Sequence, residues 1–189
     1  MTALPTNLTP GTWNFDALHS DFGFVARHAG ISKVRGEFTE FTGAISVADE
    51  FENSTVEAAA NVASITTGNE QRDGHLRSSD FFLAEEHPQA TFRSTAIENF
   101  DGAEFDLVGD LTMRGVTRPV TFKAEFNGAA VDGDSALAGF SATTTVNRKD
   151  FGMKFDVALG GGELLVSDKI AINIEIEAAK QAYDEAELA

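Results

Sequence analysis

Apolar and polar residues alternate along much of the chain, and the pattern is clearest over residues 103–127, AEFDLVGDLTMRGVTRPVTFKAEFN. The apolar positions of one parity are Phe105, Leu107, Leu111 and Met113 before the break and Val120, Phe122, Ala124 and Phe126 after it. A period of two places one side of a strand in the core and the other in water. The break at Arg114-Gly115 is typical of a turn, because glycine accepts a positive φ. These residues therefore predict a β-hairpin, which needs further sheet to cover its apolar side.

Shorter runs of alternation predict more strands on both sides of this hairpin. They are residues 13–15, 22–28, 34–41, 43–47, 54–66, 90–97, 135–147 and 166–176. Residues 127–134, rich in glycine and aspartate, predict a loop. The alanines of residues 54–66 also suit a helix, but alternation and β-branched flanks favour a strand. Ala58 and Ala60 share one side of it, and small inward residues would leave room inside the sheet.

One helical insertion interrupts the strands. Residues 69–77 lack β-branched side chains, and Asn69 can cap a helix there. Residues 79–88 indicate a second short helical or turn segment. Because strands and helices do not alternate regularly, the predicted fold class is all-β and antiparallel. We expect a barrel of about eight long strands with a short helical insertion around residues 69–88, since closure removes exposed edges. Such a barrel holds its own side chains or one small ligand.

Composition narrows the classes of function. The formal net charge of −16 argues against nucleic-acid binding and against docking on an anionic membrane through a basic patch. Cysteine is absent, which excludes a disulfide framework and a thiolate nucleophile. The chain has no apolar run of roughly 20 residues, as a spanning helix requires. Without a basic and apolar leader, the expected location is cytoplasmic, with an exported mature form as the alternative. Nucleophile elbows, phosphate loops and dinucleotide fingerprints are also absent, so no enzyme activity and no cofactor are expected.

Six short motifs, in a fixed order, make the chain similar to a known family. They are His19-Ser20 with Phe24 and His28, VRGEFTEFTG at 34–43, RDGHL and SDFF within 72–82, PQATF at 88–92, GDLT through GVTRPV within 109–120, and NRKDFG at 147–152. Over residues 11–178 the sequence resembles the YceI-like family of polyisoprenoid-binding, lipocalin-like barrels. The resemblance implies one domain over residues 11–178, with flexible termini at 1–10 and 179–189. It also implies an internal apolar tunnel that holds an isoprenoid, a quinone or a similar long-chain lipid.

The residues expected to contact this lipid come from the motifs and from inward parities. They are Phe22, Phe24, His28, Phe38, Arg72, His75, Leu76, Phe92, Leu111, Arg148, Asp150 and Phe151. His28 either bonds the lipid head or is satisfied by a neighbour. Arg72 and His75 share a helix face and are expected in a lid over one barrel end. An inward Arg148 needs a partner, and Asp150 is the nearest candidate in the sequence.

Other functions remain open from the residues alone. An enzyme acting on a lipid-like substrate would use His28 or His75 as its acid or base. A structural barrel would instead fill its lumen with the 16 phenylalanines. The four histidines lack the close spacing of a zinc site, so no metal is expected. A homodimer formed through an exposed strand is left open.

Overall fold

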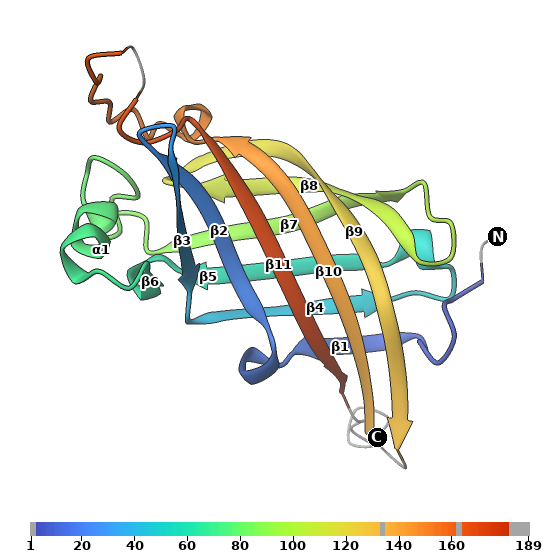
Figure 1. The fold of residues 1–189 in the computed structure, drawn as a ribbon. Coiled ribbons are helices and arrows are strands. Elements are labelled where there is room, and N and C mark those ends of the chain that lie inside the picture. The colour runs from blue at the N-terminus through green and yellow to red at the C-terminus, as the bar shows by residue number, and fades with distance from the viewer. Residues whose placement is uncertain (1–2, 133–134, 162–163, 182–189) are drawn as a thin grey trace.

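A computed structural model describes residues 3–132, 135–161 and 164–181 as an antiparallel β-barrel (Figure 1). Its strands are β1 Gly11–Phe15, β2 Asp21–His28, β3 Ser32–Phe38, β4 Phe41–Val47, β5 Thr55–Asn61, β6 Ile65–Thr66, β7 Gln89–Glu98, β8 Glu104–Met113, β9 Val116–Asp132, β10 Ser135–Asn147 and β11 Lys169–Lys180. One α-helix, α1 Glu70–Arg77, and four 3-10 turns, η1 Ala17–His19, η2 Phe51–Asn53, η3 Val62–Ser64 and η4 Arg148–Phe151, connect them.

Eight strands close the barrel in the order β1-β4-β5-β7-β8-β9-β10-β11, because β11 pairs back with β1. One edge of β11 is shared between two strands. Its end at residues 178–180 pairs with β1, whereas residues 171–175 pair with β2. From β2 the sheet continues to β3 and β6, which widen the wall on the side of α1 (Figure 1). The prediction of an all-β, antiparallel barrel with eight long strands and one short helix is therefore confirmed.

The hairpin of residues 103–127 forms as predicted, but its second strand is longer. β8 and β9 pair up to Met113 and Val116, with Arg114 and Gly115 at positive φ in the turn. The predicted loop at 127–134 is wrong over residues 127–132, because β9 continues to Asp132 and pairs with β10, while residues 133–134 lie outside the described ranges. The pairing register shifts between Gly139 and Phe140, opposite Gly128. A glycine inside a strand often marks such a bulge, so here it bends the strand and does not end it.

The structure also places other element boundaries at residues that differ from the predicted ones. The strand expected over 54–66 is interrupted by η3, where the Asn61 side chain accepts a hydrogen bond from Ala63 N. Leu8 lies in the lead-in that we expected to be flexible, yet it is buried. Beyond residue 178, where the predicted domain ends, Lys180 still pairs with Trp13. Most of the predicted flexible terminus at 179–189 lies outside the described residues.

Bulky side chains close one end of the barrel. Trp13 is fully buried, and its Nε1 donates a hydrogen bond to Thr9 O at 3.0 Å. The ring of Phe51 packs between two others, with centroids 4.3 Å from Phe100 and 5.1 Å from Phe105. Such aromatic contacts add to the free energy of burial. The interior is thus plugged at this end, and any opening lies at the other.

Replacing Phe51 tests this plug. Phe51→Ala removes a ring that is only 1% exposed, so the free energy of unfolding should fall by about 3–5 kcal/mol. Leu18→Ala is the control, since Leu18 is 90% exposed and its loss should change stability by less than about 0.5 kcal/mol. Urea denaturation of both variants measures the difference. A loss at Phe51 no larger than that at Leu18 would contradict the described packing.

Candidate functional site

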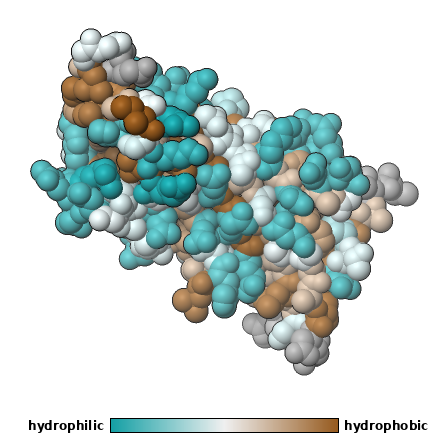
Figure 2. Space-filling model, in the orientation of Figure 1, coloured by the Kyte–Doolittle hydropathy of each residue, from teal (hydrophilic) through white to brown (hydrophobic). Residues whose placement is uncertain are grey.

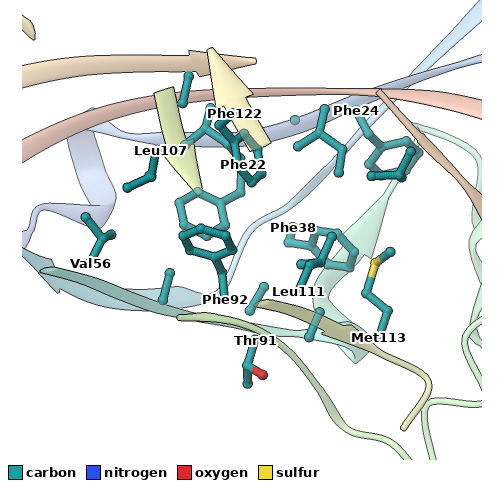
Figure 3. A pocket seen from close by; sticks show the side chains of 18 of the residues that line it. Phe22, Phe24, Phe38, Val56, Thr91, Phe92, Leu107, Leu111, Met113 and Phe122 are labelled. Carbon is teal, nitrogen blue, oxygen red and sulfur yellow. The ribbon is translucent and has the colours of Figure 1, made fainter. Parts of the chain in front are cut away.

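The barrel encloses a cavity of about 230 Å³, and its wall is almost entirely carbon. All eight closing strands contribute inward residues to the wall. In Figure 3, Phe22, Phe92 and Leu111 point into this space, whereas Thr91 points away from it. Two serines beside the wall are already bonded: Ser54 Oγ accepts from Ala48 N at 3.0 Å, and Ser141 Oγ donates to Glu175 Oε2 at 2.6 Å. The interior therefore suits hydrocarbon better than water or a polar metabolite.

Small residues and flat-lying rings keep this space open. Ala58 and Ala60 of β5 lie on the wall, as the parity of residues 54–66 predicted. Phe24 lies over Gly36 on the neighbouring strand, where a Cβ atom would approach the ring to 2.3 Å. Phe92 similarly covers Gly109, with a corresponding distance of 2.4 Å. Because each glycine lets a ring lie against the backbone, the rings line the lumen without filling it.

At the open end, α1 is held next to the barrel by its own polar contacts. The Asn69 side chain caps the helix by accepting from Arg72 N at 3.0 Å, as predicted. Asp73 is buried and accepts from Thr67 N at 2.8 Å. These contacts place Leu76 on the cavity wall. The predicted helix over this barrel end is therefore present, with an apolar residue facing inward.

Residues 152–161 and 164–168, together called the 152–168 segment, bound the opening beside α1. The His75 ring makes edge contacts with Phe155 and Phe81, at centroid distances of 4.8 and 5.1 Å. His75 Nε2 also lies 2.7 Å from Asp80 Oδ2. These contacts join α1 to the 152–168 segment. Met153 and Val166 of that segment line the cavity, so the opening is bounded by residues far apart in the sequence.

Arg148 is the one charged residue on the described cavity wall, and it is only 3% exposed. Its guanidinium donates to Asp156 Oδ1 at 2.9 Å and to Asp168 Oδ1 at 3.2 Å. It also donates to three backbone carbonyl oxygens, those of Met153, Val166 and Ser167. The predicted Arg148–Asp150 pair is wrong, because the Asp150 side chain is exposed and both carboxylate partners of Arg148 come from the 152–168 segment.

Lys149 completes this charge cluster. Its Nζ lies 2.8 Å from Asp156 Oδ2 and 3.2 Å from Asp168 Oδ1. The hydrogen bond from Lys149 holds the pKa of Asp156 below its ordinary value, with a further contribution from Arg148. Hydrogen bonds to Asp156 and then Asp168 raise the pKa of Lys149. Two cations and two anions therefore balance at the opening.

The structure places seven of the twelve predicted site residues on the cavity wall and five elsewhere. On the wall are Phe22, Phe24, Phe38, Leu76, Phe92, Leu111 and Arg148. Away from it are His28, Arg72, His75, Asp150 and Phe151. Phe151 is buried in a neighbouring core cluster, whereas the other four are exposed. Parity placed the strand residues correctly, but it could not orient residues in the helix, in η4 or at a strand end.

The histidines do not gather into one site. His28 is exposed at the end of β2, and His75 contacts Asp80 and the rings of Phe81 and Phe155. Neither imidazole lies on the cavity wall. Arg72 is bonded to Thr67 and is likewise turned away from the lumen.

Among the described residues, one group of three could offer ligand atoms to a metal: Asp16, His19 and Glu177. His19 Nδ1 lies 2.8 Å from Asp16 Oδ2 and 3.5 Å from Glu177 Oε1. The hydrogen bond to Asp16 raises the pKa of His19, and the same bond lowers the pKa of Asp16. Attraction to these carboxylates accounts for the arrangement when the imidazole is protonated. The group is on the surface and away from the cavity.

Sequence reasoning missed several wall residues. Phe81, Phe82, Met153 and Val166 lie in turns and irregular segments, where alternation gives no signal. Ala142 of β10 and Ala124 of β9 also line the cavity, and the parity of their strands could have identified both. The wall residues for which alternation gave no signal therefore lie in the segments around the opening, where long-range packing sets the positions.

The fold and the cavity define a class: closed antiparallel β-barrels with an apolar interior open at one end. Residues 13–178 match the family model described as the YceI-like domain, and the chain belongs to this family. A similar relative is UPF0312 protein SA2479 of Staphylococcus aureus (strain N315), which is 36% identical over 170 residues. The match covers 87% of this chain and 95% of the relative. The resemblance inferred from the six motifs is thereby confirmed.

Solved structures share the fold. The Campylobacter jejuni YCEI protein is 30% identical with a TM-score of 0.68, over 82% of this chain and 90% of that protein. Burkholderia cenocepacia BcnA is 23% identical with a TM-score of 0.72, over 86% and 98%. A polyisoprenoid binding domain from Saccharophagus degradans is 14% identical with a TM-score of 0.65, over 89% and 98%. The last two establish likeness of fold alone. No helix within the described ranges is both long and apolar enough to cross a membrane.

Substituting Arg148 tests the charge cluster at the opening. Arg148→Met leaves two carboxylates with one cation and three carbonyls without their donor, so the free energy of unfolding should fall by on the order of 3 kcal/mol. Arg93→Met is the control, because Arg93 forms an exposed ion pair with Glu57 and its loss should have little effect. Thermal unfolding compares the two. Equal stability of both variants would contradict a structural role for Arg148.

Proposed function

We propose that this protein binds a long-chain apolar lipid, such as an isoprenoid or a quinone-type lipid, inside the barrel for carriage or sequestration. The observation that carries the proposal is the cavity itself, an enclosed space whose wall is almost entirely carbon. The solved domain from Saccharophagus degradans that shares this fold is described as polyisoprenoid-binding, which agrees with the proposal.

Burial of the lipid tail provides the binding free energy. If the tail loses about 300 Å² of apolar surface to water, the gross gain is about 7 kcal/mol at roughly 25 cal/mol per Å². The loss of translational and conformational freedom subtracts from that gain. Because hydrocarbon contacts have little directionality, selectivity should depend mainly on the length and girth of the tail.

The charge balance at the opening favours a neutral head group. Arg148 is the charged residue on the described wall. The carboxylates of Asp156 and Asp168 already neutralise the positive charges of Arg148 and Lys149. A diphosphate would have to displace these carboxylates or bring additional negative charge beside them. A quinone or an alcohol requires neither, so we propose a neutral head at this end.

Extraction of the purified protein tests the proposal. Organic solvent should release a long-chain apolar lipid in near-stoichiometric amount, which mass spectrometry identifies. Protein stripped of that lipid should take up an added prenyl lipid. Repeated recovery of no lipid, together with no uptake of the added one, would contradict the proposed function.

Two neighbouring alanines provide a sharper test. Ala58 lines the cavity, and Ala59, next in the sequence, has the opposite parity. Ala58→Phe places a ring in the lumen and should lower prenyl-lipid uptake by at least tenfold, since the tail loses its space. Ala59→Phe adds the same ring on the outer side and should leave uptake unchanged. Uptake by titration and folding by circular dichroism are measured for both; unchanged uptake by folded Ala58→Phe protein would argue against an internal site.

A cytoplasmic location and homodimer formation stay predictions. Light scattering of the purified protein measures the oligomeric state, and cell fractionation measures the location.

A further inference from the structure

The open end of the barrel carries apolar side chains that face water. Ile31, at the tip of the β2–β3 turn, is 84% exposed, and Val157 in the 152–168 segment is 41% exposed. A backbone hydrogen bond from Ala29 N to Leu165 O at 3.0 Å joins the turn to this segment, and within the segment Leu165 N donates to Val157 O at 2.9 Å. Ile31 and Val157 therefore belong to one surface at the end where Val166 lines the cavity. Figure 2 shows hydrophobic surface interleaved with hydrophilic surface at this end.

The outward side of the same turn is basic. Arg27 and Lys33 are directly opposite each other in the β2–β3 register, and Arg35 follows two residues later. All three are exposed, and none takes part in an ion pair within the described part of the chain. The acidic residues of this strand pair are Asp21, at its other end, and Glu37, two residues beyond Arg35 on the same side of β3, so three cations face one nearby carboxylate. Like charges directly opposite each other destabilise a sheet, so an anionic partner would relieve this arrangement.

The net charge of −16 is a sum over the whole chain, and only that sum argues against binding to an anionic surface. At physiological ionic strength, exposed charges more than about 8 Å apart are largely screened. Local charges therefore decide a contact at the open end. The nearby carboxylates of Asp156 and Asp168 are neutralised by Arg148 and Lys149. The basic turn is thus left with an excess of positive charge, contrary to what the composition suggested.

We propose that this open end docks on a bilayer containing anionic phospholipids. Ile31 and Val157 enter the headgroup region, while Arg27, Lys33 and Arg35 contact the lipid phosphates. The inference rests on the proposed function, because docking here places the cavity opening against the source of an apolar lipid. Two apolar side chains and three cations give weak, reversible attachment, which lets a loaded carrier leave the surface.

Vesicle co-sedimentation of the full chain tests this proposal. The protein should bind phosphatidylcholine vesicles that contain phosphatidylglycerol, more weakly as salt rises, and should not bind phosphatidylcholine alone. Arg27→Gln/Lys33→Gln should lower the partition coefficient about 30-fold, at about 1 kcal/mol per cation. Ile31→Ser should lower it about tenfold. Thermal unfolding verifies that each variant is folded.

Matched controls separate local from general effects. Arg93→Gln/Lys123→Gln removes the same charge from exposed positions elsewhere on the barrel, and should leave vesicle binding unchanged. Leu18→Ser removes a side chain that is 90% exposed, in η1 before the opposite end of β2, and should also have no effect. Equal losses in the test and control variants would overturn the docking surface.

Lipid extraction in parallel distinguishes the two proposals. Protein that carries an apolar lipid but ignores both kinds of vesicle would overturn docking and leave the proposed function standing. Protein that docks as expected but neither contains nor takes up a prenyl lipid would overturn the proposed function, while the docking surface would remain supported.

Discussion

The structure depends on keeping the inward side of a closed sheet apolar without filling it. Alternation supplies the apolar side chains, and a barrel of eight strands has little space to spare for them. Glycine on a neighbouring strand solves this problem locally. Gly36 and Gly109 let Phe24 and Phe92 lie flat against the wall, and Ala58 and Ala60 add almost no bulk. The cavity exists because of these pairings, although the chain contains 16 phenylalanines that could have closed it.

The two ends of the lumen are built from opposite kinds of chemistry. Trp13 and Phe51 close one end with rings that are almost completely buried. The other end is bounded by α1 and the 152–168 segment, and Arg148 binds that segment through two carboxylates and three carbonyls. Removing a charge from water is costly unless its partners are present. Arg148 has these partners, so its guanidinium can lie next to the apolar cavity and fix the 152–168 segment at the opening.

The sequence predicted the regular part of the molecule well, because local patterns determine it. Parity identified the hairpin around Gly115 and placed Phe22, Phe92 and Leu111 on the inward side. Gly128 was misread as a loop because a glycine in a bulge and one in a turn look alike in a single sequence. Arg148 was paired with Asp150 because they are close in the sequence. Its carboxylate partners, Asp156 and Asp168, lie eight and twenty residues further along the chain. Only folding brings them within hydrogen-bond distance of Arg148.

The distribution of charge, like the partners of Arg148, could not be predicted from composition alone. The total of −16 is a property of the sequence, but the basic turn next to the opening appears only when β2 and β3 pair. The opening is consequently the place where the apolar interior, a neutralised charge cluster and a basic rim meet. We therefore propose the opening as the place where a hydrophobic molecule is exchanged with a lipid surface.

The most direct measurement is the electron density inside the lumen, in crystals of protein purified without removal of lipid. We expect one continuous, elongated feature that begins near Phe51 and reaches Met153 at the opening. Discrete ordered waters in that space, or phenylalanine rings turned across it from wall to wall, would contradict a vacant apolar lumen that takes up a hydrocarbon chain.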